Sequence, residues 1–333
     1  MRLSRRQLAA TTLAATTLGV LAAPAIGQAQ PAWPSRPVRF IIPFPPGGAA
    51  DLVGRMLAAH FQQALGQGFV VENRGGAGSA IGVDALAKAP ADGSAVGMIN
   101  IAANAILPAV RKVPLPYRPI EDFAPISNLA VTPALLLVNP RKLPDVRNVA
   151  ELVAAAKARP EAINFGSSGV GSSLHLGMEL FMAKAGIRMT HVPFNGGGPL
   201  LQALLAGTVD VSLDVAATTT QVIRDGQIRA LATTAPARMA IYPDLPALNE
   251  TYPGAELASW HGLAAPAGTP APILARLAAE TQAFLRAPDI QQRYTQLNLD
   301  MPQHTTPEAF RDFMTRELAT FRDLAQAQNI VVE

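Results

Sequence analysis

Residues 38–61 read VRFIIPFPPGGAADLVGRMLAAHF and predict a strand, a glycine turn and a helix in succession. The apolar run 38–42 is typical of a buried strand, and 43–48 of a tight turn. The apolar residues after the turn recur at helical spacing and predict one buried helix face: Val53, Met56, Leu57, Phe61 and Ala64. The first turn of such a helix has free N–H groups that can face an anion. The unit therefore indicates either a tight turn alone or a site for a small anionic group.

A second unit of the same kind follows directly. Residues 69–73 read as a strand, 74–79 (RGGAGS) as a turn and 80–89 as a helix. Gly76, Gly78 and Gly82 approach the glycine fingerprint of dinucleotide-binding folds, but the spacing differs by one residue. No acidic residue ends a strand at the expected distance either. The turn therefore does not predict a nucleotide site.

Two later units are the richest in glycine and serine. Strands are expected at 162–165 and 189–194, and the turns after them read GSSGVGSS (166–173) and NGGGP (195–199). A further strand at 209–215 carries Asp214 near its end. The turns offer free N–H groups and hydroxyls that hydrogen-bond a carboxylate without an arginine; the serines are Ser79, Ser167, Ser168, Ser172 and Ser173. One such serine is typical of an ordinary N-cap, so it is the convergence of the turns that predicts a carboxylate site.

Strands and helices alternate along the chain, which predicts an α/β fold of mostly parallel sheets with helices on both faces. A long apolar stretch at 126–138 and the segment 259–264 are expected to cross between two lobes, leaving a ligand cleft between them. The predicted division is an export signal at 1–29, a first segment of lobe 1 at 30–130, lobe 2 at 131–255 and a C-terminal segment of lobe 1 at 256–333.

The N-terminus accounts for the positive charge of the chain. Arg5-Arg6 precedes an uncharged run that ends in Ala-Pro-Ala and Gly-Gln-Ala, both of which resemble signal cleavage sites. The pattern predicts export by a twin-arginine-like or a general secretory signal, cleaved near residues 25–29. The formal charge is +3, and the first 29 residues hold three arginines and no acid, so the mature chain is near neutral. We expect a periplasmic monomer with no cofactor and no nucleic-acid or membrane-surface partner.

Several kinds of chemistry are disfavoured by residue usage. The chain has no cysteine, which excludes disulfides, thiolate metal sites and a cysteine nucleophile. Its histidines are scattered, so no metal site is predicted. A periplasmic hydrolase stays open as an alternative, because Ser172, His175 and Asp214 are the residue types of a triad. Against it, no G-x-S-x-G turn is present, and His175 follows Ser172 on the same predicted helix.

Motifs along the whole mature chain resemble the extracytoplasmic solute-binding receptors of tripartite tricarboxylate transporters, the Bug proteins. They are WPSRPV (33–38), IIPFPPGG (41–48) with Asp51, VVENR (70–74), LPY (115–117), GSSG (166–169), HVPF (191–194), RALA (229–232) and APAGTP (265–270). The resemblance implies a two-lobed periplasmic binding protein fold, type II-like. It also implies a receptor, not an enzyme, that binds a small carboxylate in its cleft and delivers it to integral-membrane permease components.

The resemblance further implies which residues hold the ligand. In that family the first strand–helix turn and the glycine-serine turn of lobe 2 bind the carboxylate, partly through ordered waters. The matching positions, with Ser79 and Asp214 as further candidates, are Phe44, Gly47, Gly48, Ala49, Ala50, Asp51, Ser167, Ser168, Gly169, Gly171, Ser172 and His175. Asn195 stands where the family often has a basic residue, which removes a partner for a second carboxylate. Arg74, the cation near these turns, is expected to be structural.

The ligand itself is left open by this pattern, because such turns recognise only a carboxylate headgroup. Organic acids, amino acids and aromatic acids all fit. A receptor that signals rather than feeding transport is a third possibility. A receptor binds its ligand stoichiometrically and without turnover, which separates it from the hydrolase.

Overall fold

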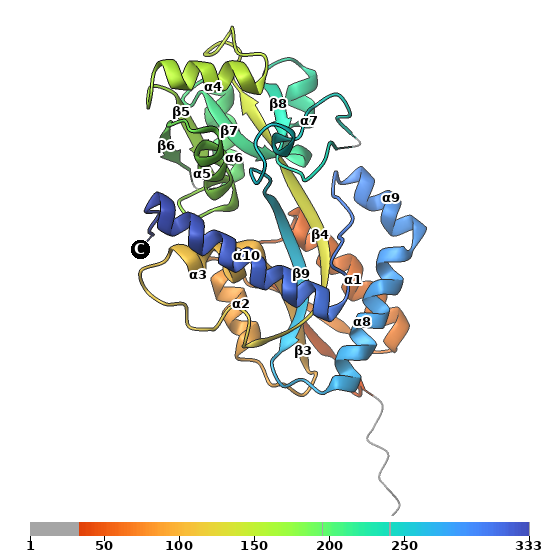
Figure 1. The fold of residues 1–333 in the computed structure, drawn as a ribbon. Coiled ribbons are helices and arrows are strands. Elements are labelled where there is room, and N and C mark those ends of the chain that lie inside the picture. Colours follow the sequence, from red (N-terminus) through yellow and green to blue (C-terminus); the bar gives the residue numbers. More distant parts are fainter. Residues whose placement is uncertain (1–32, 195, 240, 333) are drawn as a thin grey trace, which may run out of the picture. The chain divides into compact units, whose positions relative to one another are not determined.

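The computed structural model describes residues 33–194, 196–239 and 241–332; the predicted export signal and Asn195 lie outside them. Within these residues the chain forms an α/β fold around one nine-stranded sheet (Figure 1). The strands are β1 Val38–Ile42, β2 Phe69–Asn73, β3 Ala95–Asn100, β4 Phe123–Val138, β5 Asn164–Ser167, β6 Thr190–Pro193, β7 Val211–Val215, β8 Arg229–Thr233 and β9 Ala258–Pro266. The α-helices are α1 Ala49–Leu65, α2 Ala80–Ala87, α3 Leu107–Val110, α4 Val149–Ala158, α5 Ser173–Ala185, α6 Gly197–Ala206, α7 Ala216–Arg224, α8 Ala271–Arg286, α9 Pro288–Gln296 and α10 Pro307–Gln328.

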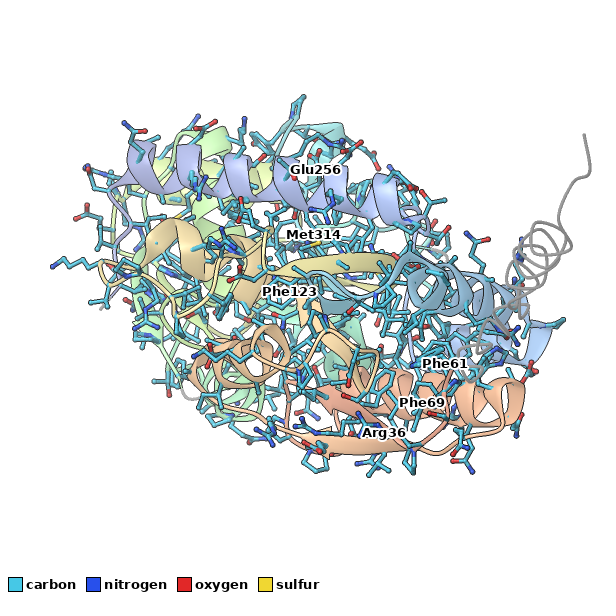
Figure 2. The ribbon with its side chains drawn as sticks, turned by 90° about the horizontal axis from the view of Figure 1, so that it is seen from below. Arg36, Phe61, Phe69, Phe123, Glu256 and Met314 are labelled. Atoms are coloured by element: carbon cyan, nitrogen blue, oxygen red, sulfur yellow. The ribbon has the colours of Figure 1, made fainter. Side chains whose placement is uncertain are left out.

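One end of the sheet is built from the N-terminal strand–helix units. β1 lies between β2 and β3, and both pairings are parallel. Parallel neighbours end at the same edge of the sheet, so the turns after them meet there. On the predicted apolar face of α1, Val53, Leu57 and Phe61 are fully buried, while Ala64 is exposed. Figure 2 labels Phe61 beside Phe69 of β2, and their ring centroids lie 5.0 Å apart.

Two long strands, β4 and β9, join this end of the sheet to the other. β9 pairs antiparallel with β3 and with β4 from Phe123 to Pro133. Beyond Pro133, β4 pairs antiparallel with β7 and β8 instead. The pairing of β4 with β9 shifts register at bulges, one of them between Asn128 and Ala130. The two segments predicted to cross between lobes therefore lie within these strands.

The other end of the sheet repeats the parallel arrangement. β5 lies between β6 and β7, and both pairings are parallel. The predicted α/β class is confirmed, but the sheet is mixed rather than mostly parallel, because the pairings of β4 and β9 are antiparallel. The division of the chain into lobes after residues 130 and 255 stays a prediction.

Helix α10 packs across β4 and β9 (Figure 1). Its buried Phe310 meets Trp260 of β9 edge to face, with ring centroids 5.5 Å apart. Gly262 leaves room for this contact, because a Cβ there would lie 2.1 Å from the Phe310 ring. In the part of the chain that the structure describes, no helix, the 22-residue α10 included, is both long and apolar enough to span a membrane.

Candidate functional site

A cavity of about 1120 Å³, which we call the turn cavity, lies where the turns after β1, β2, β5 and β6 meet. Its lining comprises residues 43–45, 76–79, 102, 107, 111, 168–173, 196, 197, 331 and 332. The four strands belong to the parallel parts of the sheet, and the cavity lies at their carboxyl ends. Open α/β sheets usually bind their ligands at this position.

The turn after β1 is held together by Asp51. This buried carboxylate accepts hydrogen bonds from the Gly47 N–H at 2.9 Å, from Asn73 at 2.8 Å and from Arg55 at 2.9 Å. Burial raises the pKa of Asp51, but these hydrogen bonds outweigh it and hold the pKa below its usual value. Phe44 lines the turn cavity, whereas the described lining does not include Gly47, Gly48, Ala50 or Asp51; α1 begins at Ala49. The Asp51 carboxylate therefore serves the turn itself.

The turn after β2 has an uncommon backbone conformation. Ala77, Gly78 and Ser79 have φ values of 48°, 63° and 75°, a region that residues other than glycine rarely adopt. The Ser79 hydroxyl donates to Asn100 Oδ1 at 3.0 Å, and this oxygen also accepts the Ala102 N–H. Backbone strain of this kind persists where surrounding contacts impose it, which is frequent at binding sites. Residues 76–79 all line the turn cavity, and Ser79 is the one among them predicted from the sequence as a candidate ligand residue.

The turn after β5 contributes a continuous stretch of wall that includes four predicted residues, Ser168, Gly169, Gly171 and Ser172. Ser172 is the N-cap of α5, since its hydroxyl accepts the His175 N–H at 3.2 Å. Gly169 and Gly171 have φ values of 134° and 76°, which glycine adopts without strain. Ser173, the first residue of α5, adds a further hydroxyl to the wall.

Backbone donors of this turn are largely used within the protein. Gly169 N–H donates to Ser167 Oγ at 3.2 Å, and Gly171 N–H donates to His175 Nδ1 at 3.2 Å. Ser172 N–H donates to the Gly169 carbonyl at 3.1 Å. These three donors, which the sequence assigned to the ligand, are therefore engaged inside the turn.

Ser167 and His175 lie beneath the turn and outside the described lining of the cavity. β5 continues to Ser167, beyond the strand expected at 162–165, and brings its hydroxyl to 2.6 Å from His191 Nε2. The His191 and His175 rings stack, with centroids 3.9 Å apart. Burial, with the neighbouring His175 adding to it, lowers the pKa of His191 to about 4, so this ring is neutral at pH 7. The stacked rings support the turn from behind.

Asp214 lies at the end of β7 and is 2% exposed. Its Oδ1 accepts the Val215 N–H at 2.8 Å, whereas its buried Oδ2 has no hydrogen-bond partner among the described residues. Burial raises the pKa of Asp214 to about 6. A Cβ at Gly197, which lines the turn cavity, would lie 3.9 Å from Oδ1. The carboxyl group therefore sits behind the Gly197 wall rather than in it.

The structure adds a cation that sequence reasoning missed. Arg111, at the end of α3, lines the turn cavity, and its Nε is buried without a hydrogen-bond partner among the described residues. The C-terminal tail joins the same wall, because the Val332 N–H donates to the Val110 carbonyl at 2.8 Å. Arg74, by contrast, pairs with Glu72 at 3.2 Å and is not part of the described lining. No local motif marks Arg111, which reaches the cavity through tertiary packing.

The triad considered as an alternative is not assembled. His175 accepts the Gly171 N–H at Nδ1, and its Nε2 faces Glu179 at 3.5 Å. Asp214 bonds its own neighbours in β7 and α7, so Ser172, His175 and Asp214 do not form the hydrogen-bonded chain of a hydrolase. Across residues 33–332, apart from positions 195 and 240, no group of three or more histidines and acids could hold a metal ion.

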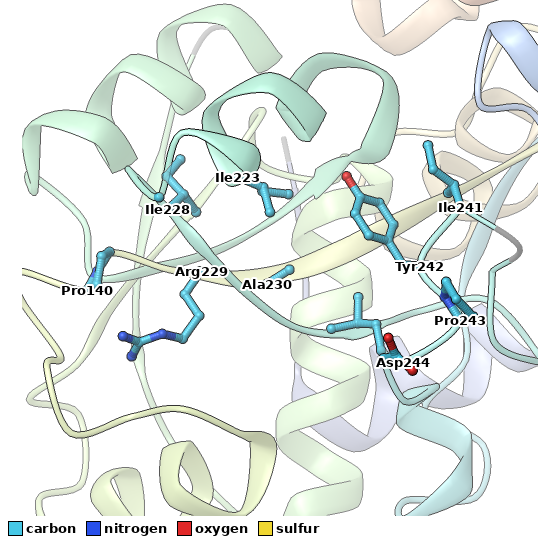
Figure 3. A pocket seen from close by; sticks show the side chains of 11 residues that line it. Pro140, Ile223, Ile228, Arg229, Ala230, Ile241, Tyr242, Pro243 and Asp244 are labelled. Atoms are coloured by element: carbon cyan, nitrogen blue, oxygen red, sulfur yellow. The ribbon is translucent and has the colours of Figure 1, made fainter.

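A cavity of about 570 Å³ beside β8 is a weaker candidate (Figure 3). Arg229, one of its lining residues, donates to the Val146 carbonyl oxygen, and the Tyr242 hydroxyl donates to Thr220 at 2.9 Å. Its lining, as described, contains none of the predicted site residues. Since these polar groups are already paired within the protein, the turn cavity is the better candidate.

Known proteins are similar to this chain in sequence and in fold. Residues 53–330 match the family model of the tripartite tricarboxylate transporter family receptor, TctC. The UPF0065 protein in the tcbD-tcbE intergenic region of Pseudomonas sp. (strain P51) is 35% identical over 322 residues, which are 96% of this chain and 93% of that protein.

Solved structures extend the likeness to three dimensions. The periplasmic binding protein BugD is 31% identical, with a TM-score of 0.75 over 90% of this chain and 100% of its own. An R. palustris protein solved with adipate is 32% identical, with a TM-score of 0.78 over 90% of this chain and 99% of its own. These matches confirm the two-lobed periplasmic binding protein fold and do not support the hydrolase. The chain belongs to the receptor family of the tripartite tricarboxylate transporters, whose members are solute-binding receptors and not enzymes.

Proposed function

We propose that this receptor binds a small carboxylate in the turn cavity and delivers it to the integral-membrane permease components of its transporter. The observation that carries the proposal is the chemistry of the cavity wall. As described, the wall offers serine hydroxyls, helix-start N–H groups and the guanidinium of Arg111, and it includes no aspartate or glutamate. Such a set of donors favours an anion by both charge and hydrogen bonding. The adipate bound by the R. palustris relative supports this class of ligand.

The donors of the turn cavity fall into two groups. Ser168, Ser172 and Ser173 surround the start of α5, where first-turn N–H groups lack intrahelical partners. The helix dipole favours an anion there by about 0.3–1 kcal/mol. Arg111 is a separate cation whose planar guanidinium can bind a second carboxylate with two hydrogen bonds. We therefore propose a dicarboxylate as the ligand class. Arg111 binds the second carboxylate, for which Asn195 supplies no positive charge.

The predicted site residues receive different roles in this proposal. Those assigned to the wall that contacts the ligand are Phe44, Ser79, Ser168, Gly169, Gly171 and Ser172. Those assigned to positioning the turns are Asp51, Ser167 and His175. Asp214, whose Oδ1 lies behind Gly197 and whose Oδ2 has no hydrogen-bond partner among the described residues, is assigned to a hydrogen-bond donor that the ligand carries besides its carboxylates. The assignment of Gly47, Gly48, Ala49 and Ala50 to the ligand rests on the family resemblance alone.

We also propose that the chain is exported, cleaved near residues 25–29, and acts as a periplasmic monomer. The relative BugD, a periplasmic binding protein, supports the compartment. Intact mass spectrometry of the exported protein should find an N-terminus at about residues 26–30. A periplasmic product that still carries residues 1–25 would contradict the cleavage.

Isothermal titration calorimetry of the mature protein with dicarboxylates and monocarboxylates of matched length tests the ligand site. Arg111→Gln should weaken dicarboxylate binding by about 10-fold or more, because charge-assisted hydrogen bonds are worth about 1.5–3 kcal/mol. Binding of the monocarboxylate should change little. Arg74→Gln is the matched control, since Arg74 pairs with Glu72 away from the cavity, and it should bind like the wild type. Unchanged dicarboxylate affinity in Arg111→Gln would contradict the proposed ligand class.

A further inference from the structure

A second cavity, of about 300 Å³, lies between α10 and the strands β4 and β9, and we call it the α10 cavity. Its walls also include the loop 300–304 and the segment 256–258. Glu256, labelled beside α10 in Figure 2, lines this cavity together with Glu317 of α10. The residues of the carboxylate site are not part of its described lining, so the α10 cavity is separate from the turn cavity.

Several polar groups of the α10 cavity, whose lining also includes Gln303 and Thr320, are hydrogen-bond acceptors that lack a donor. Asn128, at the bulge of β4, is 1% exposed, and its Oδ1 is buried with no hydrogen-bond partner among the described residues. Glu256 Oε2 is buried and unpartnered in the same part of the structure. Glu317 Oε2 accepts one long hydrogen bond, 3.3 Å, from the Trp260 indole, and Asp300 adds a third carboxyl group. Buried acceptors without donors are unfavourable unless something else supplies the donor.

No cation of the described lining neutralises these acceptors, because it contains neither lysine nor arginine. Burial, with the charge of Arg316 adding to it, lowers the pKa of His304, so this lining residue is neutral at pH 7. The remaining wall is largely apolar, with the aromatic rings of Trp260, Phe313 and Phe321. Aromatic rings next to carboxylates are the surroundings in which proteins hold organic cations.

We propose that the α10 cavity binds a small organic cation, an ammonium group carried on an apolar body. The ammonium donates to Asn128 Oδ1, Glu256 and Glu317, which supplies the donors that these oxygens lack. The apolar body packs against Trp260 and Phe313. The cavity volume is at the lower end of the range for ligand pockets, which limits the body to about the size of one ring. A metal ion is not favoured, because the described residues include no group arranged to hold one.

Binding of the cation should depend on pH through Glu317. Burial raises the pKa of Glu317 to about 7, and Glu256 adds to the rise, while the Trp260 hydrogen bond and Arg316 oppose it. Burial also raises the pKa of Asp300. Because a bound ammonium favours the ionised carboxylate, its affinity should increase several-fold from about pH 6 to pH 8.

Calorimetry of the mature chain with benzylamine at about pH 8 tests the proposal, with benzyl alcohol as the neutral probe of the same shape. We expect saturable binding of benzylamine and none of benzyl alcohol. Glu317→Gln should weaken benzylamine binding at least 10-fold and flatten its pH dependence. Glu308→Gln removes a charge from an exposed position of the same helix and should bind benzylamine like the wild type.

A second variant blocks the α10 cavity without changing its charge. Met301 lines the cavity and is 38% exposed, so Met301→Trp should fill the opening and abolish benzylamine binding while dicarboxylate binding persists. Circular dichroism checks that each variant is folded. The proposal is overturned if the wild type does not bind benzylamine, if benzyl alcohol binds equally well, or if either Glu317→Gln or Met301→Trp binds benzylamine like the wild type.

Discussion

The turn cavity and the α10 cavity present opposite chemistry on one sheet. In the described lining, the turn cavity has hydroxyls, helix starts and Arg111 but no acid, whereas the α10 cavity has carboxyl groups and an amide oxygen but no lysine or arginine. The turn cavity lies at the carboxyl ends of parallel strands, and the α10 cavity lies beside the antiparallel pair β4 and β9. Parallel strands with crossover helices gather helix N-termini at one edge, and these favour anions. Beside antiparallel strands, selectivity has to come from side chains.

The largest expected effect is on the pH dependence of stability and concerns the α10 cavity. The pKa of Glu317 is about 7 in the folded protein, above its ordinary value of 4.5. A carboxyl group with a raised pKa contributes its full stabilisation of the folded state at pH values below its ordinary pKa. This contribution decreases as the pH rises above that value and is lost once the pH has passed through 7. At about 1.4 kcal/mol per pKa unit, the unfolding free energy of the wild type should fall by up to about 3 kcal/mol between about pH 4.5 and 7.5 because of Glu317. Glu317→Gln should not show this loss.

Urea unfolding of the wild type and Glu317→Gln across this pH range measures the effect. His191, with a pKa lowered to about 4, acts in the opposite direction: it destabilises the protein as the pH falls from about 6.5 to 4. It does so equally in both proteins, so the difference between their profiles isolates Glu317. Superimposable profiles would show that the α10 cavity does not hold Glu317 as a buried acid.

Gly82→Ala should damage the turn cavity through packing and leave the α10 cavity intact. A Cβ at Gly82 would lie 2.5 Å from the Arg74 carbonyl oxygen and 2.6 Å from Pro43 Cα, which are backbone atoms of the first two turns. Overpacking of this kind lowers the unfolding free energy by about 1–3 kcal/mol, and dicarboxylate affinity should fall with it. Gly198→Ala is the matched control in a helix, since its Cβ would meet nothing within 4 Å.

Urea unfolding and calorimetry with both ligands distinguish the two cavities. Benzylamine binding should be unchanged in Gly82→Ala. Equal urea midpoints for Gly82→Ala and Gly198→Ala would mean that the first two turns are not packed as closely as the structure shows.

The turns of the candidate site were predictable because their signal is local. Phe44, Ser168 and Ser172 each lie within a few residues of a strand end, where glycine and serine mark a helix start. Arg111 and Val332 were not predictable in this way. They meet through a bridge between the end of α3 and the C-terminal tail, and no pattern in either segment indicates that pairing.

The roles of Asp51 and Ser167 could be assigned only from the three-dimensional path of the backbone. An aspartate just after a glycine turn can face a ligand or bond back to the turn, and here Asp51 accepts the Gly47 N–H. Ser167 lies beneath the turn because β5 ends two residues later than the strand expected at 162–165. The antiparallel pairing of β4 and β9 could likewise not be predicted from the sequence. The pattern of apolar residues in one strand carries no information on the direction of its neighbour.

The smallest expected effect is that of a single hydroxyl in the turn cavity. Ser168→Ala should weaken dicarboxylate binding by about 0.5–1.5 kcal/mol, the usual net contribution of one hydrogen bond, and should leave benzylamine binding unchanged. Ser35→Ala, at an exposed position away from the cavity, is the control. Calorimetry of the two variants side by side measures the difference, and a complete loss of binding in Ser168→Ala would instead indicate that one hydroxyl dominates the site.

A crystal structure of the mature protein with its tightest dicarboxylate tests the central claim most directly. We predict one carboxylate at the start of α5, within about 3 Å of the Ser168, Ser172 or Ser173 hydroxyls, and the other paired with the Arg111 guanidinium. The α10 cavity should contain none of the acid. A dicarboxylate bound outside the turn cavity, or bound within it with both carboxylates away from Arg111 and the α5 serines, would contradict the account.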